Sequence, residues 1–486
     1  MPEPFIFEIS RPGRSGYTIA ESSVGSRPIV ELLPDVPLRD RLDLPEVAQI
    51  DVTRHFTRLS QMNFSIDTNF YPLGSCTMKF NPKVHEDVVC LPGFADLHPL
   101  QDPTDAQGAL QLMFELQDYL AAISGMDAVT LQPAAGAHGE LVGVLVIRAY
   151  HLDRGDTSRR RILVPDSAHG TNPASAAICG FEVTSVKSNL SGGVDIDDLR
   201  TKLGPDVAGL MITIPSTLGL FDEGLVEVTD LVHAAGGLVY CDGANLNAVV
   251  GRVRFGDLGG DVMHFNLHKT FTTPHGGGGP GAGPVAVKSH LAPYLPVPIV
   301  TRTANPNAEY ALDFDRPKTI GRVRAFFGNF GMLVRAYTYI RMLGAKGLAE
   351  VSDNAVLNAN YLRARLREAY DIPFDRMCMH EFVLSARRQK AEGIRALDIA
   401  KRLIDLGYHP PTIYFPLVVE EAMMIEPTET ESKETLDAFA DAMLQIAREV
   451  RENPDLLHNA PVTTPVRRLD EVTAARKPNT RYAPPV

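Results

Sequence analysis

The stretch GLVYCDGANLNAVVGRVRFGDLGGDVMHFNLHKT at residues 237–270 contains two short apolar runs, each closely followed by a residue that can carry chemistry. GLVYC at 237–241 precedes Asp242, and VMHFNL at 262–267 ends two positions before Lys269. Runs of this kind are typical of strands that are buried on both faces of a parallel sheet. Because ligands bind at the carboxyl edge of such sheets, Asp242 and Lys269 are predicted to share one site.

Similar apolar runs occur on both sides of this stretch. They are RILV at 161–164, FEVTSV at 181–186, GLMITI at 209–214 and PVAVK at 284–288. Helical patterns separate several of them, including VEVTDLVHAA at 226–235, and an amphipathic helix is predicted from about residue 107. The alternation predicts an α/β domain whose mostly parallel sheet is covered on both sides.

The chain of 486 residues is too long for a single core, and its patterns predict four parts. The N-terminal arm and extension are expected to pack on a partner subunit, because the first 60 residues or so lack sustained periodicity. The other parts are a large α/β domain, a smaller α+β domain with helices over 395–406 and 433–450, and a tail rich in Pro and basic residues. The predicted boundaries are 1–105, 106–330, 331–455 and 456–486.

Composition excludes several classes of function. A formal net charge of -12 argues against nucleic acid as a partner, because binding a polyanion requires clustered Lys and Arg. The five cysteines are odd in number and never spaced as CxxC, so neither a disulfide framework nor a metal site is predicted, and a reducing cytoplasm is expected. No secretory signal and no run of about 18 apolar residues is present, so no membrane association is predicted.

Lys269 and Asp242 together favour a pyridoxal 5'-phosphate (PLP) site. Such sites combine a lysine that forms a Schiff base with an Asp or Arg partner to the ring nitrogen. Taken singly, a lysine is usually a solvated surface residue, and an Asp after a strand often caps a helix. Their occurrence at two strand ends favours the PLP interpretation, and Gly243 and Ala244 would allow a flat ligand to approach.

Other strand ends offer further candidate contacts to such a cofactor. In LQPAAGAHGELVGVLVIRAY at 131–150, Gly136 and Ala137 precede an apolar helix and could bind a phosphate through backbone N–H groups, although an ordinary helix start remains an alternative. His169, in VPDSAHGTNPASAA, could stack over an aromatic ring, although a lone histidine is more often structural. Ser216 in TIPSTLG offers a hydroxyl, as do Thr213 and Thr217.

A competing motif lies in the glycine-rich stretch after Lys269. Gly276, Gly278 and Gly281 formally satisfy GxGxxG, the fingerprint of dinucleotide binding. That fingerprint should open a helix after the first strand, whereas here the glycines are followed by prolines and the strand-like PVAVK. A dinucleotide-dependent dehydrogenase is therefore the weaker alternative.

Five longer strings resemble the P-protein family, glycine dehydrogenase (decarboxylating). They are YPLGSCTMKFNPK at 71–83, AHGTNPASA at 168–176, DGANLNA at 242–248, NLHKTFTTPHGGGGPG at 266–281 and MMIEPTETES at 423–432. The resemblance covers nearly the whole chain and corresponds to the C-terminal, lysine-bearing half, which is subunit 2 (beta) of the split form.

The resemblance implies the PLP-dependent transferase fold of type I, with a seven-stranded-type sheet and a smaller C-terminal domain. It implies that Lys269 forms the Schiff base, that Asp242 holds the pyridinium and that His169 stacks on the ring. The remaining implied contacts are Gly136, Ala137 and His268 about the phosphate, Ser216 and Ala244 near the ring, and Ser75, Thr77 and Lys79 of GSCTMK as a contribution to the substrate site. Single-chain relatives tend to have Asn and Ser where this chain has Ala134 and Ala135, which puts side-chain contacts there in doubt.

The activity implied by the resemblance is decarboxylation of glycine, with release of CO2 and transfer of the aminomethyl group to the oxidised lipoyl arm of the H-protein. The implied partner is P-protein subunit 1 (alpha) in an α2β2 heterotetramer. Arg324, Arg335 and Lys79 are available cations for the glycine carboxylate, but none is assigned. Another fold-type-I enzyme, such as an amino-acid decarboxylase or a cysteine desulfurase-like protein, and a noncatalytic structural subunit remain alternatives.

Overall fold

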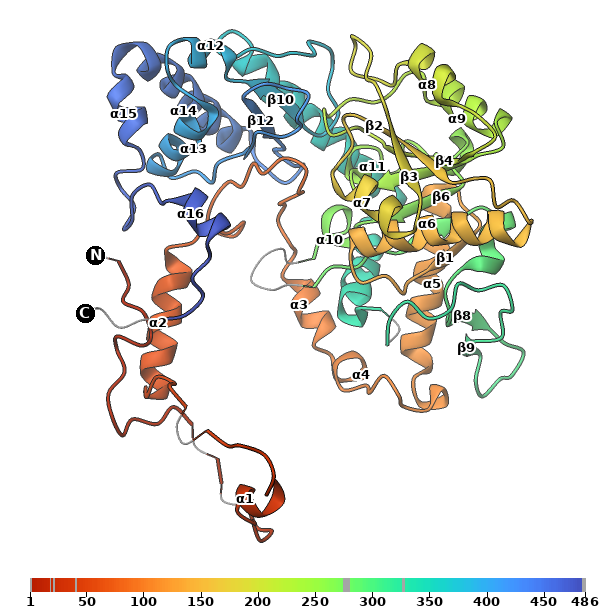
Figure 1. The fold of residues 1–486 in the computed structure, drawn as a ribbon, viewed down its shortest axis with the longest axis horizontal. Helices are drawn as coiled ribbons and strands as arrows, with labels where there is room; N and C mark the ends of the chain where they lie inside the picture. The colour runs from red at the N-terminus through yellow and green to blue at the C-terminus, as the bar shows by residue number, and fades with distance from the viewer. Residues whose placement is uncertain are drawn as a thin grey trace.

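The computed structural model describes residues 2–17, 19–20, 22–39, 42–273, 280–325 and 328–482. A large domain and a smaller domain lie side by side, and an N-terminal arm projects away from both (Figure 1). The long helix α11 (Phe330–Leu366) runs from the large domain into the small one. The helix leaves regular geometry at Gly344, whose φ of 61° is in the left-handed region that glycine adopts without a steric penalty.

The large domain is built on a seven-stranded sheet in the order β1-β7-β6-β5-β4-β2-β3. The strands are β1 (Ala128–Thr130), β2 (Arg161–Pro165), β3 (Glu182–Val186), β4 (Val207–Thr213), β5 (Leu238–Gly243), β6 (Val262–Phe265) and β7 (Val285–Val287). All neighbouring pairs are parallel except those that β7 makes with β6 and β1. The predicted mostly parallel sheet is therefore confirmed. The short strand β1 was not predicted, because three residues give no recognisable alternation.

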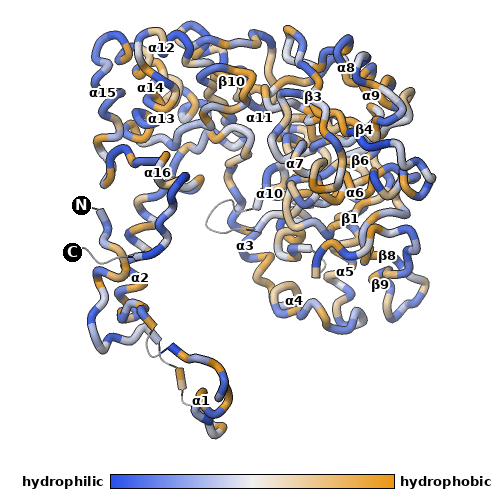
Figure 2. Tube along the Cα trace, viewed as in Figure 1, coloured by the Kyte–Doolittle hydropathy of each residue, from blue (hydrophilic) through white to orange (hydrophobic). Residues whose placement is uncertain are grey.

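Helices cover both faces of this sheet. They are α5 (Gln107–Ser124), α6 (Gly136–Asp153), α7 (Thr171–Ile178), α8 (Ile196–Lys202), α9 (Leu225–Ala234) and the short α10 (Leu267–Thr270). Val239 and Cys241 of β5 belong to the core cluster that contains residues of α5 and α9, whereas Leu238 and Tyr240 belong to the cluster that contains residues of α6. Burial on both faces explains why the strands are continuous apolar runs, and Figure 2 shows hydrophobic residues gathered in this sheet.

The small domain is a three-stranded antiparallel sheet covered by helices. Its strands are β10 (Phe382–Ser385), β12 (Ala422–Ile425) and β11 (Thr412–Ile413), in that order. Its helices are α12 (Arg387–Ala391), α13 (Ala396–Asp405), α14 (Lys433–Glu452) and α15 (Pro454–Asn459). The predicted helices at 395–406 and 433–450 are confirmed by α13 and α14. A hairpin of β8 (Ile299–Arg302) and β9 (Tyr310–Asp313) lies on the large domain, against α5.

The N-terminal region contains more helix than its sequence pattern predicted. It forms α1 (Ile29–Leu32), α2 (Gln49–Gln61), α3 (Val84–Val89) and α4 (Pro92–Ala95). The 13-residue helix α2 corrects the expectation of an aperiodic arm. Val52, Phe56 and Leu59 of this helix are spaced by three or four residues, which is the signal that was overlooked.

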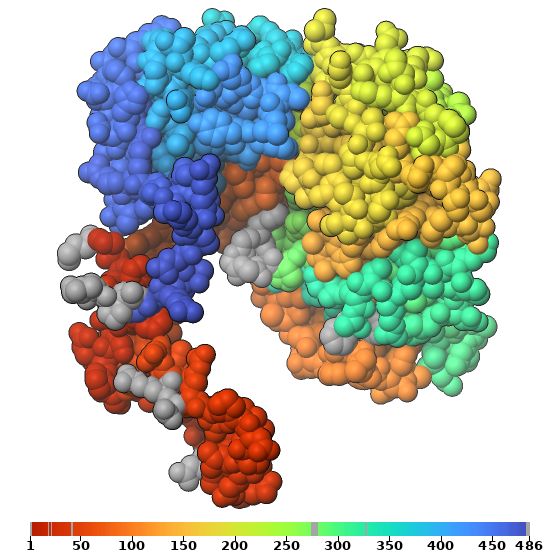
Figure 3. Space-filling model, in the orientation of Figure 1, coloured from red at the N-terminus to blue at the C-terminus, as the bar shows by residue number. Residues whose placement is uncertain are grey.

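The arm also contacts the C-terminal tail of the same chain. Phe7 stacks on Tyr482 with ring centroids 4.6 Å apart, and α16 (Glu471–Arg476) is linked to α13 by an ion pair of 3.0 Å between Lys401 and Glu471. The arm nevertheless stands clear of the large domain in Figure 3. The division into four parts stays a prediction. In the parts of the chain that the structure describes, no helix combines the length and apolar character needed to span a membrane.

Candidate active site

The carboxyl edge of the central sheet brings together the residues that the sequence singled out. Asp242 is the second-last residue of strand β5, and it pairs with Thr213 of β4 and His264 of β6 in the sheet. Lys269 lies in α10, which begins two residues after β6. His169 follows β2, and Gly136 begins α6 after β1. Parallel strands end at the same edge, so residues separated by more than 130 positions meet there.

Asp242 is a buried carboxylate with three polar partners. It accepts hydrogen bonds from Asn172 Nδ2 at 2.9 Å and from the Ala244 backbone N–H at 2.9 Å. His264 Nε2 lies 3.4 Å from Asp242 Oδ1. Burial alone would raise the pKa of Asp242, but His264, Asn172 and the Ala244 N–H together lower it below the usual value. Asp242 therefore supplies a negative charge at the sheet edge at neutral pH.

A second layer of buried groups lies behind this carboxylate. His264 Nδ1 lies 2.6 Å from the hydroxyl of Tyr240, and both side chains are fully buried. Burial lowers the pKa of His264, while the charge of Asp242 opposes this shift. The Tyr240–His264–Asp242 chain was not predicted, although His264 and Asp242 occupy paired positions on adjacent strands.

Lys269 is half-buried and its ammonium group contacts the N-terminal region. Lys269 Nζ donates to the carbonyl of Ser75 at 2.8 Å. Ser75 has a φ of 64°, an uncommon conformation for a residue with a side chain, and its N–H donates to Glu381 Oε2 at 2.7 Å. The structure therefore places Ser75, which was predicted as a secondary site residue, directly beside Lys269.

The predicted phosphate cradle lies at the first turn of α6. Gly136 is buried, and a Cβ at this position would overlap the side-chain oxygen of Asn266. The position requires glycine for that reason. Ala137 is exposed and follows in the same turn of α6. His268, in α10, accepts a hydrogen bond at Nδ1 from the Ala282 N–H at 3.3 Å.

His169 and Ser216 occupy the turns after β2 and β4. His169 is exposed, its Nδ1 lies 2.8 Å from Thr171 Oγ1, and its ring meets Phe415 of the small domain edge-on at 5.7 Å between centroids. Ser216 is half-buried, and its hydroxyl accepts from the Leu218 N–H at 3.3 Å within its own turn. Both side chains lie beside the sheet edge. Among the described residues, neither forms a hydrogen bond with Lys269 or Asp242.

Glu140 of α6 is a buried acid that the sequence did not point to. It accepts from Thr171 Oγ1 at 2.7 Å and from Ser175 Oγ at 3.2 Å. Burial, and next the charge of Asp242, raise the pKa of Glu140 to about 7. Glu140 is thus linked through Thr171 to His169, and it titrates near physiological pH.

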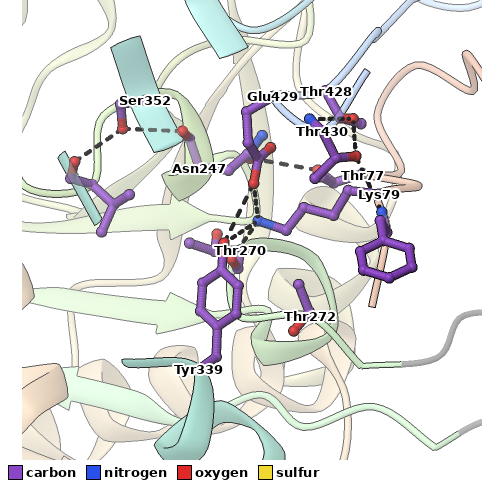
Figure 4. A network of polar contacts seen from close by, with 12 residues as sticks. Thr77, Lys79, Asn247, Thr270, Thr272, Tyr339, Ser352, Thr428, Glu429 and Thr430 are labelled. Atoms are coloured by element: carbon purple, nitrogen blue, oxygen red, sulfur yellow. Dashed lines mark hydrogen bonds and ion pairs between the residues drawn. The ribbon is translucent and has the colours of Figure 1, made fainter. Parts of the chain in front are cut away.

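Lys79 lies in a saturated network between the domains (Figure 4). Its ammonium donates to the Thr270 carbonyl at 2.7 Å, to Tyr339 OH at 3.2 Å and to Glu429 Oε1 at 2.6 Å. These partners use all three N–H donors, and Lys79 is 3% exposed. Lys79 as a substrate contact stays a prediction, and binding a ligand there would require one of these three hydrogen bonds to break.

The other two candidate cations for a substrate carboxylate are also engaged. Arg335 is buried and forms a two-pronged ion pair with Glu86. Arg324 Nη1 donates to Asn329 Oδ1 at 3.1 Å. Neither arginine is assigned to a substrate.

Two further buried acids, Glu381 and Glu426, were missed by sequence reasoning. Glu426 accepts from the hydroxyl of Thr77 at 2.6 Å and from Asn247 Nδ2 at 3.1 Å. Glu426 belongs to the MMIEPTETES string. It is 157 residues from Lys269 in the sequence, so nothing in the sequence predicted that the two residues lie near each other. Thr77 is thus buried against an acid of the small domain.

The dinucleotide alternative lacks its structural context. Gly276 and Gly278 lie outside the described residues, but Gly281 leads into strand β7. The fingerprint requires a helix at that point.

The fold and the residues at the carboxyl edge of the sheet indicate the class of protein. Residues 145–295 match the family model described as Aminotransferase class-V, and residues 351–461 match the one described as Glycine dehydrogenase, C-terminal domain. A solved structure of glycine decarboxylase (P-protein) of the glycine cleavage system, in inhibitor-bound form, superposes with a TM-score of 0.74. That likeness has 22% sequence identity, covers 86% of this chain and 94% of the other, and shows the fold alone. The fold is type I of the PLP-dependent transferases.

Full-length relatives define the family within this class. The chain is 61% identical over 483 residues to probable glycine dehydrogenase (decarboxylating) subunit 2 of Exiguobacterium sibiricum, covering 99% of this chain and 98% of the relative. It is 60% identical over 486 residues to the protein of the same name from Desulforamulus reducens, with 100% of both chains covered. The chain belongs to the family of glycine dehydrogenase (decarboxylating) subunit 2.

Proposed function

We propose that this chain binds PLP through Lys269 and decarboxylates glycine, with transfer of the aminomethyl group to the oxidised lipoyl arm of the H-protein and release of CO2. The observation that carries the proposal is the pairing of Lys269 with the buried carboxylate Asp242 at one sheet edge, in a chain of this family. A nucleophilic amine and a carboxylate for the ring nitrogen are the two groups that a PLP site requires.

The residues at this edge fit the cofactor chemically. Asn172 Oδ1, Thr213 Oγ1 and Asn266 Oδ1 are buried and have no hydrogen-bond partner among the described residues. Buried polar atoms are normally paired, so unpaired atoms around one edge suit a polar ligand. The buried Gly136 at the N-terminus of the 18-residue helix α6 suits its phosphate, because backbone N–H groups and the helix dipole both favour an anion there.

Each residue would have a distinct task. The amine of Lys269 would hold the cofactor covalently until glycine replaces it. The ionised Asp242 would keep a proton on the ring nitrogen, and Gly136, Ala137 and His268 would hold the phosphate. His169, Ser216 and Ala244 would border the ring, and Ser75 and Thr77 would limit the site on the N-terminal side. When bound, the cofactor supplies the electron sink that the loss of CO2 requires.

A separate partner subunit is part of this proposal. The relatives carry the name subunit 2, and the N-terminal arm exposes many apolar side chains that a partner could cover. These include Tyr17, Ile19, Val24, Ile29, Val30, Leu42 and Leu44. We expect subunit 1 (alpha) to cover this arm in an α2β2 heterotetramer.

Reduction with borohydride tests the central assignment. The full chain, with its partner subunit and PLP, should lose its visible absorption band on reduction, and peptide mapping should find the pyridoxyl label on Lys269. Lys433→Ala, a change at an exposed lysine on α14, should label as the wild type does. A label on another lysine, or no band, would refute the site.

Turnover tests the reaction separately from cofactor binding. Exchange of the glycine carboxyl group with labelled bicarbonate should require the lipoylated H-protein and the partner subunit. Turnover of glutamate or cysteine in place of glycine would favour another fold-type-I enzyme.

A further inference from the structure

Two glutamates face each other at the end of the small-domain sheet. Glu381 immediately precedes β10 and Glu426 immediately follows β12, and the antiparallel ladder pairs Phe382 with Ile425. The two acids are therefore the next cross-strand neighbours, and they are 0% and 1% exposed. Like charges directly opposite in a sheet are destabilising, so two ionised carboxylates would be costly at this position.

Each acid has one oxygen in a hydrogen bond and one oxygen without a hydrogen bond among the described residues, although Glu381 Oε1 lies 3.7 Å from His380 Nε2. Glu381 Oε2 accepts from the Ser75 N–H at 2.7 Å, and Glu426 Oε1 accepts from Thr77 and Asn247. Glu381 Oε1 and Glu426 Oε2 are buried without a hydrogen-bond partner among the described residues. One ligand atom from each acid and one from His380 lie within 4.8 Å of one another. Protonation of one of the two acids would remove the cost of two ionised carboxylates at this position.

The pair is connected to Lys269 through the peptide of Ser75. The N–H of Ser75 donates to Glu381, and its carbonyl accepts from Lys269 Nζ. The positive φ of Ser75 is held between these two contacts. A change in Glu381 should therefore move the carbonyl that Lys269 contacts.

Burial raises the pKa values of both acids, and the charged groups around them raise or lower these values further. Burial, then the charge of Glu426, raise the pKa of Glu381 well above its usual value. Burial raises the pKa of Glu426 to about 7, while the charge of Lys269 lowers both values and Glu429 raises that of Glu426. Burial lowers the pKa of the adjacent His380 to about 3, so that ring is neutral, and burial raises the pKa of the Cys76 thiol, which stays protonated.

We propose that Glu381 and Glu426 are positioning residues for Lys269 and form a pair of buried acids that takes up and releases a proton to balance its charge. When the ammonium of Lys269 gives up its proton, the pair binds one proton from solvent, and it releases this proton when the positive charge returns. The inference rests on the proposed function of Lys269. Under that function it explains how the lysine can be displaced and restored without leaving unbalanced charge in a buried site.

Infrared spectroscopy on the cofactor-free full chain with its partner subunit tests the pair directly. The wild type should show the carbonyl stretch of a protonated carboxyl group that titrates close to pH 7, and Glu426→Gln should remove that titration. Lys269→Ala should move the midpoint upward by about one pH unit or more, because an opposite charge nearby lowers a carboxyl pKa. A purely structural role for the acids would not produce this shift.

Matched variants keep the test decisive. Glu449→Gln should leave the band unchanged, because hydrogen bonds from Arg402 lower the pKa of Glu449 and keep it ionised. If Glu426→Gln fails to fold by circular dichroism, Glu381→Gln and Lys269→Ala still report on the pair. No carboxyl titration near neutrality, an unchanged midpoint in Lys269→Ala, or a stoichiometric divalent ion that is lost in Glu381→Gln would overturn the proposal. Since no cofactor is present, failure here is distinct from failure of PLP binding.

Discussion

Lys79 and Lys269 both lie where the two domains meet, but their ammonium groups have opposite environments. Lys79 is almost fully buried and donates to three acceptors, one of which is the carboxylate of Glu429. Lys269 is half-buried and donates to one backbone carbonyl, that of Ser75. Because Thr270, the residue after Lys269, supplies one of the acceptors for Lys79, the first lysine holds the short helix that carries the second.

The comparison shows that two lysines at the same domain junction can differ in their capacity to react. A lysine whose three donors are occupied cannot attack a carbonyl without breaking a buried ion pair, and breaking such a pair is costly. A lysine held by one neutral acceptor can leave it easily. The number and charge of the partners therefore distinguish the two lysines and support the proposal that Lys269 is the reactive one.

The largest expected effect comes from removing the amine that we propose to be reactive. Lys269→Ala should lower glycine-dependent turnover by about four orders of magnitude or more, the scale seen when a covalent nucleophile is lost. The measurement is the initial rate with the partner subunit and lipoylated H-protein, with Lys433→Ala as the control. A rate within about tenfold of the wild type would break the distinction between the two lysines.

Removing the structural amine should instead act on stability. Lys79→Met leaves Glu429 buried without its partner and should lower the free energy of unfolding by about 3–5 kcal/mol. Denaturant unfolding measures this, and Lys79→Met with Glu429→Gln should recover part of the loss, because no buried charge then remains. Full stability in the single variant would show that the ion pair does not hold the domains together.

Asp242 should matter for the reaction and little for the fold. Asp242→Asn keeps the size of the side chain but removes the charge, and turnover should fall by about 10²–10³, as when an electrostatic partner is lost. Because both carboxylate oxygens accept hydrogen bonds, the new amide NH2 would face a donor and the thermal midpoint should fall slightly, so turnover is measured well below it. A rate loss explained by unfolding, or no rate loss, would remove Asp242 from the site.

Glu140 gives the smallest expected effect, and one that depends on pH. Its pKa is raised to about 7, so it is protonated below pH 7 and ionised above it. Glu140→Gln stays neutral at every pH and should match the wild-type rate at pH 6, while differing from it by about threefold or more at pH 8. Parallel rate profiles of the two proteins over this range would contradict the link from Glu140 to His169.

Most of the large-domain fold could be predicted from the sequence. The apolar runs at 161–164, 181–186, 209–214, 237–241 and 262–267 correspond to β2 to β6, because burial on both faces leaves a continuous hydrophobic signal. The shared edge of Asp242 and Lys269 followed from the geometry of parallel strands. The helix α2 and the strand β1 escaped prediction, the first because its helical spacing is limited to a single 13-residue stretch of an otherwise aperiodic region and the second because it is only three residues long.

The sequence by itself determined the α/β layering, the strand ends that carry Asp242 and Lys269, and the family. Only the tertiary structure decided that Lys79 is saturated, that Asn172 and His264 hold Asp242, and that Glu381 and Glu426 lie beside the Ser75 peptide. Local patterns record hydrophobic burial and chain direction, since both repeat over a few residues. Polar partners are set by tertiary packing, which joins groups 22 to 349 residues apart within and between the domains and leaves no periodic signal.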